Sequence, residues 1–306
     1  MIKISVVIVH FGRDELLFDC LCSISKQDTP PDELIIVDNS SRQTGAAPLP
    51  RTGCAVTTIR NSHNRGFSAA ANQGIRSSSG DYVVVMNSDV TLACGFMSAI
   101  GPASSDAVCQ KTGAFACLIV DRRHRVDSKG LYLTFLRRFF DMYRGKPYRQ
   151  GDGSAGRVFG ASGACAVYRR DFLEAVKIGG EYFDEDFFLM VEDVDLAWRS
   201  QLLGWQMRHD PRLMCYHHGG ISHERNALSQ YYAFRNRYCM IIKNEGAFGL
   251  IRLMFFSWIY DIPRFVWVLM TNPYAVPALA DMIRLIPVMV RKRNLLHRKM
   301  LMLRSI

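Results

Sequence analysis

The stretch DEDFFLMVEDVDLAWR at residues 184–199 combines acidic side chains with apolar ones, and from Glu192 onward its spacing is helical. Glu192 and Asp195 share one face at i,i+3, and Asp195 can pair with Arg199 at i,i+4. An inward apolar stripe is formed by Val194, Ala197 and Trp198. The alternative is an ordinary acidic helix start, because the helix dipole favours acidic groups in a first turn. A carboxylate motif upstream and a histidine pair downstream favour a functional site over an ordinary helix start, since a divalent metal and a general base require such groups.

The upstream carboxylate is Asp89, in the segment MNSDV at residues 86–90. An acid that emerges from a buried strand is well placed to hold Mg²⁺ or Mn²⁺ bridging a diphosphate, because hard cations take carboxylate oxygens. His217 or His218 would add an imidazole ligand, which Mn²⁺ tolerates better than Mg²⁺ does. A single histidine is more often structural than ligating, so this assignment depends on its pairing with Asp89.

Two further segments carry groups suited to a nucleotide. Asp38 follows an apolar strand in IIVDNSS, where its carboxylate can accept from a base or ribose donor, although Asp-Asn after a strand is also common turn chemistry. The segment Asn64-Arg65-Gly66-Phe67 opens a helix and offers backbone donors and a guanidinium to a phosphate. Neither G-x-G-x-x-G nor G-x-x-x-x-G-K-[ST] occurs, which argues against a dinucleotide or Walker-type site.

These groups need a scaffold, and apolar strands that alternate with helices supply one. The pattern predicts parallel β-α-β units with both faces covered, an α/β fold. Ligands in such sheets bind at the carboxyl ends of the strands, where His10, Asp38 and Asp89 are expected. The predicted strands are 3–9, 33–39, 54–60 and 81–89, with helices at 13–26 and 66–77 and a Pro-, Gly- and Ser-rich loop after residue 39.

The middle of the chain is less regular. Residues 137–149 are basic and aromatic, and we interpret them as a mobile surface loop. Residues 158–170 are rich in glycine, which predicts a strand packed closely against a ligand or another backbone. A tight bulge at Gly160, Ser162 and Gly163 with no ligand nearby is the equal alternative.

The chain has 306 residues, 49% of them hydrophobic, which is enough for a substantial core. Its nine cysteines are scattered without a C-x-x-C pair, a pattern typical of reduced thiols in a cytoplasmic protein. The start MIKISVVIVHF runs directly into a predicted strand and has no signal-peptide pattern.

The net charge of +10 is concentrated near the end, where residues 247–306 hold nine Lys/Arg against two Asp/Glu. Within 250–290 a polar stripe faces a broad apolar one, and prolines interrupt it, which describes helices lying in a membrane interface rather than spanning it. The ending RKRNLLHRKMLMLR adds six cations for anionic headgroups. A basic, apolar tail suggests anionic lipid and no nucleic acid. The alternative is a helical subdomain that caps the core or forms a homodimer interface.

Seven motifs together resemble those of one family. They are VVIVHF (6–11), IIVDNSS (35–41), N-x-G-F-x-x-x-x-N-x-G-I (64–75), GDYVVVMNSD (80–89), GASGACAVYRR (160–170), FDEDFFLMVEDVDLAWR (183–199) and HHGGIS (217–222). In this order they resemble glycosyltransferase family 2, and within it the bacterial rhamnosyltransferase branch that builds cell-surface polysaccharide on polyprenyl carriers. The resemblance covers about residues 3–240, and the tail matches only as a basic amphipathic extension.

The resemblance implies a GT-A (nucleotide-diphospho-sugar transferase) fold with a mostly parallel central sheet, followed by a C-terminal amphipathic helical extension. We therefore expect a glycosyltransferase domain at 1–243 and a basic, membrane-associating tail at 244–306. The implied cofactor is a divalent metal, Mg²⁺ or Mn²⁺, held by Asp89 and His217. The residues implied to bind the donor are His10, Phe11, Asp38, Asn64, Arg65, Asn72, Asn87 and Ser88.

Two positions depart from the family pattern. Asn87 stands where the first acid of a D-x-D motif is expected, which leaves Asp89 as the only acidic ligand of that motif. Gly12 stands where the family often has Asn, which weakens the expected base contacts.

The implied reaction is a single displacement with inversion at the anomeric carbon. Asp193 is the implied general base for the acceptor hydroxyl, and Glu192 orients the acceptor. The metal and Arg65 absorb charge on the leaving diphosphate. A base at a helix N-terminus is expected to have a low pKa, and it then receives the proton late in bond formation.

The expected donor is dTDP-L-rhamnose, and the expected acceptor is a polyprenyl-diphosphate-linked saccharide at the cytoplasmic face of the inner membrane. Another nucleotide sugar is an alternative. A sugar-nucleotide pyrophosphorylase would use a similar sheet, yet VVIVHFGRDELL lacks its glycine-rich, lysine-containing signature. A non-catalytic membrane scaffold is the second rival, and Asn87 is the feature that favours it.

Overall fold

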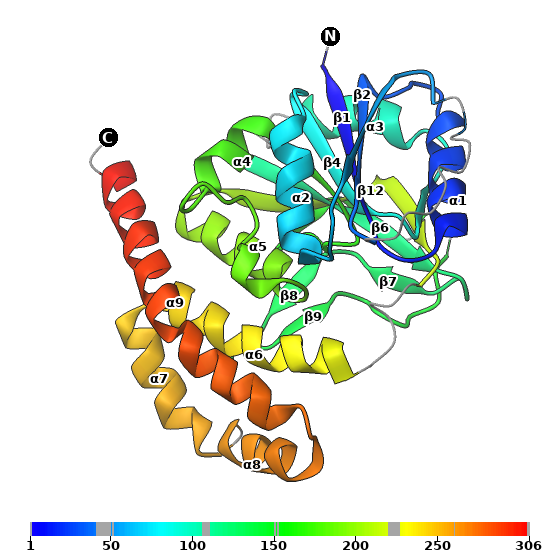
Figure 1. Ribbon diagram of the computed structural model, residues 1–306. Helices are drawn as coiled ribbons and strands as arrows, with labels where there is room; N and C mark the ends of the chain where they lie inside the picture. Colours follow the sequence, from blue (N-terminus) through cyan, green and yellow to red (C-terminus); the bar gives the residue numbers. More distant parts are fainter. Residues whose placement is uncertain are drawn as a thin grey trace.

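The computed structural model describes residues 2–40, 50, 52–105, 111–149, 151, 153–219, 227–259 and 261–304 (Figure 1). The predicted Pro-, Gly- and Ser-rich loop falls mainly on residues 41–49, outside this set, as do residues 220–222 of the HHGGIS motif. The described cysteines are free thiols.

The first part of the chain forms the parallel half of a mixed sheet. Strands β1 (Ile4–His10), β2 (Glu33–Asp38), β3 (Ala55–Arg60) and β4 (Tyr82–Asn87) run parallel in the order β3-β2-β1-β4. They confirm the predicted strands at nearly the predicted bounds. The middle residues of β1, β2 and β4 are all buried, because helices cover both faces of this half.

The second half of the sheet mixes strand directions. Strand β11 (Cys165–Arg169) runs antiparallel to both β4 and β6 (Thr112–Asp121), and β12 (Gln206–His217) runs parallel to β6. Three short strands complete this half: β5 (Val90–Leu92), β7 (Val126–Ser128) and β10 (Gly156–Val158). The carboxyl ends of β1, β4 and β12 therefore meet at one edge, where the predicted His10, Asp89 and His217 lie.

Helices cover the two faces of the sheet. Helices α1 (Asp14–Ser25) and α3 (Phe96–Ser105) pack on one face, which includes Val6 and Ile8 of β1. The opposite face, with Val7 and Val9, carries α2 (Gly66–Ser77), α4 (Arg170–Val176) and α5 (Glu192–Leu202). Alternate residues of a strand point to opposite faces, so a continuous apolar run such as β1 feeds both cores.

Residues 137–149 differ from the prediction of a mobile surface loop. They contain β9 (Phe139–Asp141), which pairs with β8 (Leu131–Leu133) in a separate two-stranded sheet. The glycine-rich segment at 158–170 contains the last residue of β10, the whole of β11 and a close-packed connection between them. A Cβ at Gly160 would lie 2.6 Å from Cβ of Ala197 on α5, so this glycine allows the close approach of another element.

The chain ends in helices α6 (Ala227–Asn244), α7 (Ala247–Ser257), α8 (Asp261–Thr271) and α9 (Ala275–Arg304). Figure 1 shows α9 running alongside α6, with α7 and α8 farthest from the sheet. Leu296 of α9 belongs to the same buried cluster as Phe172 and Leu196 of the sheet domain. None of the helices in the described ranges has the length and apolar character that a bilayer span requires.

The six cations at residues 291–304 were predicted to contact lipid headgroups, but some of them contact the protein instead. Lys292 is buried, and its Nζ contacts carboxylates of the sheet domain. Arg293 donates to the carbonyl of Ile242 at 3.2 Å, and Lys299 donates to the carbonyl of Lys177 at 3.0 Å. Three of the six predicted headgroup cations therefore bind the protein itself.

Candidate active site

A cavity of about 170 Å³ lies at the carboxyl ends of β1 and β4, and we call it the strand-end cavity. Its polar lining comes from Arg13, Asn39, Asn64, Asn87, Ser88 and Asp89, and its apolar lining includes Phe11, Phe67, Phe188, Leu189 and Leu228. Parallel strands place ligands at this edge, so the predicted polar groups and the cavity coincide.

A second cavity, also of about 170 Å³, adjoins the first, and we call it the carboxylate cavity. The two share Phe67, Asn87 and Leu189 as lining residues. Its polar lining consists of Asn87, Asp127, Asp141, Arg144, Ser162, Glu192, Asp193 and His217. The structure therefore brings the predicted base Asp193 and the predicted ligand His217 to one cavity, although they come from different elements.

His217 lies between two carboxylates. Its Nε2 is 3.3 Å from Asp89 Oδ2, and its Nδ1 is 2.8 Å from Asp127 Oδ2. Arg144 Nε lies 3.4 Å from the other Asp127 oxygen. Burial lowers the pKa of His217, but the hydrogen bonds with Asp127 and Asp89 outweigh burial and raise the pKa to about 9. A positive charge between these carboxylates is thus electrostatically favoured.

These donors fit a divalent cation. Asp127 holds Nδ1 and so directs Nε2 toward Asp89, which is how a carboxylate orients a metal-binding imidazole. The described ranges contain no cluster of three or more His, Cys, Asp or Glu residues that could hold a metal. Asp89 and His217 would therefore supply two ligands, and diphosphate oxygens and water would supply the rest, as is usual for Mg²⁺.

The carboxylates of Glu192 and Asp193 lie at the start of α5. Asp193 Oδ2 accepts from the Gly163 backbone at 2.8 Å, and Oδ1 accepts from Val194 N at 2.8 Å. Glu192 is 6% exposed, and its Oε2 has no hydrogen-bond partner in the described part of the chain. Gly163 has a defined role here, because its amide fixes the Asp193 carboxylate.

The expectation of a low pKa at this helix start is wrong. Burial, and then repulsion from Asp193, raise the pKa of Glu192 to about 8. Burial also raises the pKa of Asp193 to about 6, against the backbone hydrogen bond from Gly163. Desolvation of two adjacent carboxylates outweighs the favourable backbone groups at the helix N-terminus.

The loop that leads into α5 is strained. Phe188, Met190 and Val191 have φ values of 62°, 69° and 77°, in a region of backbone conformation that residues other than glycine rarely adopt. The Asn236 side chain on α6 donates to the carbonyls of Phe187, Leu189 and Met190 at 2.8, 2.9 and 2.8 Å. Strain of this kind persists only where surrounding contacts enforce it, and α6 supplies those contacts.

Gly66 anchors the same loop from the other side. It has φ of +81° at the start of α2, and a Cβ there would lie 2.5 Å from the carbonyl oxygen of Phe188. The amide of Ser68 donates to this carbonyl at 3.3 Å. The predicted helix start at residue 66 is thus a contact between α2 and the loop at 187–191 as well as a wall of the strand-end cavity.

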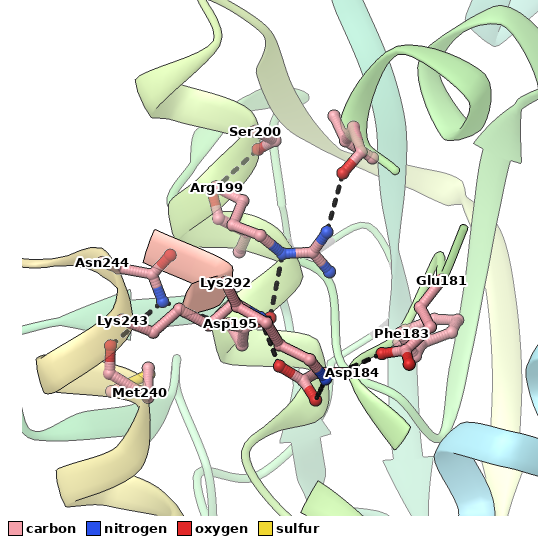
Figure 2. Close-up of polar contacts among 12 residues, drawn as sticks. Glu181, Phe183, Asp184, Asp195, Arg199, Ser200, Met240, Lys243, Asn244 and Lys292 are labelled. Carbon is pink, nitrogen blue, oxygen red and sulfur yellow. Dashed lines mark hydrogen bonds and ion pairs between the residues drawn. The ribbon is translucent and has the colours of Figure 1, made fainter. Parts of the chain in front are cut away.

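A buried charge network ties α5 to the C-terminal helices (Figure 2). Asp195 Oδ2 accepts from Arg199 Nε and from Lys243 Nζ, both at 2.9 Å, which confirms the predicted Asp195–Arg199 pair. Lys243 also binds Asp184 at 2.6 Å, and Lys292 of α9 binds Asp184 at 2.5 Å. Removing one partner of such a network leaves a buried charge unpaired, so α5 and α9 depend on each other.

Several predicted donor contacts lie at or near the strand-end cavity. Phe11, Asn64, Asn87 and Ser88 line it. His10 lies behind the cavity, where Nδ1 is 3.0 Å from Ser88 Oγ. His10 therefore supports a lining residue from beneath the cavity.

Other predicted donor residues have structural partners instead. Asp38 accepts from the Ser40 backbone and hydroxyl, and its neighbour Asn39 lines the cavity. Asn72 differs from the prediction of a donor contact. Its side-chain amide donates to the Phe183 carbonyl and the Glu185 carboxylate and accepts from Phe183 N, so it holds the loop at 183–185 against α2. The Arg65 backbone donates to Asn39, and its side chain is exposed outside the cavity lining.

The arrangement defines a class of fold. A mixed, mostly parallel sheet, helices on both faces and adjoining cavities at the strand ends are the architecture of the GT-A nucleotide-sugar transferase fold. The chain belongs to glycosyl transferase family 2, whose model matches residues 5–177.

Similar proteins agree with this membership. The poly-beta-1,6-N-acetyl-D-glucosamine synthase of Staphylococcus epidermidis is 22% identical over 225 residues, 70% of this chain and 49% of the relative. The chain thus spans about half the length of this curated relative.

Solved structures show the same fold across the chain. The S. aureus TarS 1–349 structure in complex with UDP-GlcNAc has a TM-score of 0.58 at 19% identity and covers 97% of this chain and 87% of that one. A mannosyltransferase from Pyrobaculum calidifontis in complex with GDP-Man and Mn²⁺ has a TM-score of 0.53 at 16% identity, covering 97% and 86%.

Proposed function

We propose that this protein is an inverting glycosyltransferase that moves a sugar from a nucleotide-diphosphate donor to an acceptor hydroxyl. One observation carries the proposal: Asp193 faces a cavity that adjoins the strand-end cavity, and Asn87 lines both. A nucleotide-sugar donor in the strand-end cavity would present its anomeric carbon toward the carboxylate cavity, where Asp193 would act as the base for an acceptor hydroxyl.

In this proposal Asp193 accepts the proton of the acceptor hydroxyl while Gly163 N–H holds the carboxylate in place. With a pKa of about 6, Asp193 is ionised at neutral pH and only weakly basic, which suits a base that takes the proton as the new bond forms. Glu192, with a pKa of about 8, remains largely protonated at neutral pH and can donate a hydrogen bond to the acceptor.

Asp89 and His217 would hold a divalent cation, Mg²⁺ or Mn²⁺, which neutralises charge on a leaving diphosphate. The Pyrobaculum mannosyltransferase, whose structure is a complex with GDP-Man and Mn²⁺, supports this assignment. Asp127 would orient His217 in that complex.

For the donor sugar we propose L-rhamnose carried on dTDP, supported by the order of the seven motifs and by the apolar side chains around the strand-end cavity, which suit a 6-deoxy sugar. N-acetylglucosamine on UDP is the second candidate. It is favoured by the names of the Staphylococcus relatives, a poly-N-acetylglucosamine synthase and a protein bound to UDP-GlcNAc.

For the acceptor we propose a lipid-linked saccharide at the cytoplasmic face of the inner membrane, reached by a peripherally bound enzyme. Large apolar side chains on α7, α8 and the turn between them support this proposal, since Phe255, Trp258, Ile259, Trp267 and Met270 are each more than 60% exposed. Patches of this kind mark interaction surfaces, and the basic charge of the tail favours an anionic lipid surface.

The test combines a donor screen with Asp193→Asn. Thermal shift compares dTDP-L-rhamnose, UDP-N-acetylglucosamine and GDP-mannose with and without Mn²⁺, and release of nucleoside diphosphate is followed in the presence of a bacterial lipid extract. We expect one donor to stabilise the protein in a metal-dependent way. Asp193→Asn should keep that stabilisation and lose about 100-fold or more in turnover.

Asp19→Asn, an exposed carboxylate change on α1, is the matched control and should retain turnover. Full turnover in Asp193→Asn would refute the assigned base and point to Glu192. Absence of binding by every donor would favour the non-catalytic scaffold, and pyrophosphate release from a nucleoside triphosphate plus sugar phosphate would favour the pyrophosphorylase.

A further inference from the structure

A third cavity, of about 210 Å³, lies where β9, α6 and α8 meet, and we call it the arginine cavity (Figure 1). Its lining includes Arg138 from the turn before β9, Arg237 from α6 and Arg264 from α8. Phe139 lines both this cavity and the carboxylate cavity, so the two cavities adjoin. The proposed reaction uses none of these arginines, so the arginine cavity needs a separate explanation.

The other walls of the arginine cavity are mainly aromatic. Phe140, Phe234, Tyr238 and Tyr274 contribute to them, and the Tyr274 hydroxyl donates to Gln230 of α6 at 2.8 Å. The lining therefore combines guanidinium groups with aromatic rings. Such a surface suits a ligand that has an anionic part next to an apolar part.

Arg237 is held in place by the protein. Its Nε and one terminal nitrogen donate to the carbonyls of Arg137 and Leu136 at 3.2 and 2.8 Å, and its other terminal nitrogen pairs with Asp261 at 2.9 Å. Each nitrogen of this guanidinium thus has a partner in the chain. Arg237 therefore builds the wall of the cavity and joins α6 to α8.

Arg264 is the side chain that can take up a ligand. It is exposed, and no carboxylate in the described part of the chain pairs with it. Burial raises the pKa values of Tyr238 and Tyr274, and the positive charge of Arg264 is among the groups that oppose this rise at both hydroxyls. Its guanidinium therefore acts on two rings of the cavity wall, and it can offer two parallel N–H groups to a phosphate there.

The location of the arginine cavity indicates which anion it meets. Across Phe139 lies the carboxylate cavity, where Asp193 faces the proposed acceptor hydroxyl. Trp267 follows Arg264 by three positions on α8, so the two side chains are neighbours on the helix surface. Trp267 and Met270 are 63% and 82% exposed and belong to the apolar surface proposed to meet lipid. Arg264 thus lies between that surface and the acceptor cavity.

We propose that the arginine cavity binds the diphosphate group that links a lipid chain to the acceptor saccharide. The inference deepens the proposed function and rests on it, since it takes the acceptor to be lipid-linked. Arg264 binds the diphosphate oxygens, the aromatic rings contact the first units of the lipid chain, and the saccharide extends past Phe139 to Asp193. At about 210 Å³ the cavity is smaller than the roughly 300–1,000 Å³ of sites for drug-sized molecules, so it fits the linking group and not the whole saccharide.

The test is isothermal titration calorimetry of the full chain with geranyl diphosphate, geranyl monophosphate and dihexanoyl phosphatidylglycerol. EDTA is present, so that no diphosphate binds through a metal at Asp89. We expect geranyl diphosphate to bind saturably and most tightly. Arg264→Gln should weaken its binding about tenfold or more, because charge-assisted hydrogen bonds are lost. Arg298→Gln, an exposed change on α9 outside the cavity lining, should bind as the wild type does.

The three ligands distinguish the sources of a lipid phosphate. Equal or tighter binding of geranyl monophosphate or dihexanoyl phosphatidylglycerol would assign the cavity to a single phosphate, such as a membrane headgroup, and overturn the proposal. The absence of saturable binding by geranyl diphosphate, or equal affinity in Arg264→Gln, would also overturn it.

The donor screen separates this inference from the proposed function. Arg264→Gln should keep the stabilisation by a nucleotide sugar, because Arg264 lies outside the strand-end cavity. A protein that binds a nucleotide sugar but not geranyl diphosphate would refute the diphosphate site and leave the transferase function in place. Binding of geranyl diphosphate without binding of any nucleotide sugar would refute the transferase function and leave the diphosphate site in place.

Discussion

Glu192 and Asp193 are adjacent in the sequence, but burial raises their pKa values to different extents. Burial raises the pKa of Glu192 to about 8 and that of Asp193 to about 6, and only Asp193 receives the Gly163 amide. Environment therefore gives two neighbouring acids different protonation states at neutral pH, which suits the roles proposed for them, Glu192 as a hydrogen-bond donor and Asp193 as a base.

The raised pKa of Glu192 predicts a pH-dependent cost to stability. The folded-state pKa of about 8 lies above the unfolded value of 4.5, so unfolding releases a proton between these limits, and the free energy of unfolding falls as pH rises through them. Glu192→Gln removes this dependence. Urea unfolding at pH 5 and pH 8 should show the wild type losing roughly several kcal/mol relative to the variant.

The exposed change Glu15→Gln serves as the control and should follow the wild type at both pH values. Parallel stability curves for the wild type and Glu192→Gln would mean that Glu192 ionises normally in the folded protein.

At this scale the sequence predicts residue types better than side-chain directions. Asp38 and Asn39 are neighbours after an apolar strand, and only Asn39 lines the strand-end cavity, because successive side chains point to opposite sides. Asp127 was missed because β7 has three residues and no apolar run to mark it. The low pKa expected for Asp193 was inferred from its position at the start of a helix. Its pKa is raised instead because the carboxyl group is buried, and burial depends on the tertiary fold.

At the scale of elements, the alternation of strands and helices predicted the parallel half of the sheet because its apolar runs are long and local. The mixed half was not predicted, since pairings such as β11 with β4 join residues far apart in the chain. The strained loop before α5 was also missed. Its geometry depends on Asn236, which lies more than forty residues later and has no motif of its own.

Asn236→Ala tests whether α6 holds that loop. The change removes the hydrogen bonds to three carbonyls, so the strained residues 188–191 should relax and displace Asp193 from its position. We expect turnover to fall by about tenfold or more, because small displacements of a catalytic group are costly. Hydrogen exchange should show faster exchange of the amides at 186–192.

Asn272→Ala is the control, because among the described residues the side chain of this asparagine bonds only Val268 and Thr271 at the end of α8. Unchanged exchange at 186–192 in Asn236→Ala would mean that the loop keeps its conformation without α6.

At the scale of the whole molecule, the distribution of charged and apolar groups predicts that the protein binds to a membrane surface. We expect the protein to sediment with vesicles that contain anionic lipid and to dissociate at high salt. Replacing Trp258 and Trp267 by Ser should reduce this binding about tenfold or more, because two large side chains no longer enter the interface.

Phe18→Ser, an exposed aromatic change on α1, should bind vesicles as the wild type does. Equal binding by the double tryptophan variant would show that α7 and α8 do not contact the lipid.

The buried bonds from Lys292 to the sheet domain have a consequence for synthesis of the chain. Asp184 and Asp195 are made roughly a hundred residues before the lysine that completes their network. A nascent chain on the ribosome therefore carries these carboxylates without their last partner until its final helix emerges. We therefore expect a chain that ends before residue 292 to leave Asp184 without this partner and to be less stable than the full chain.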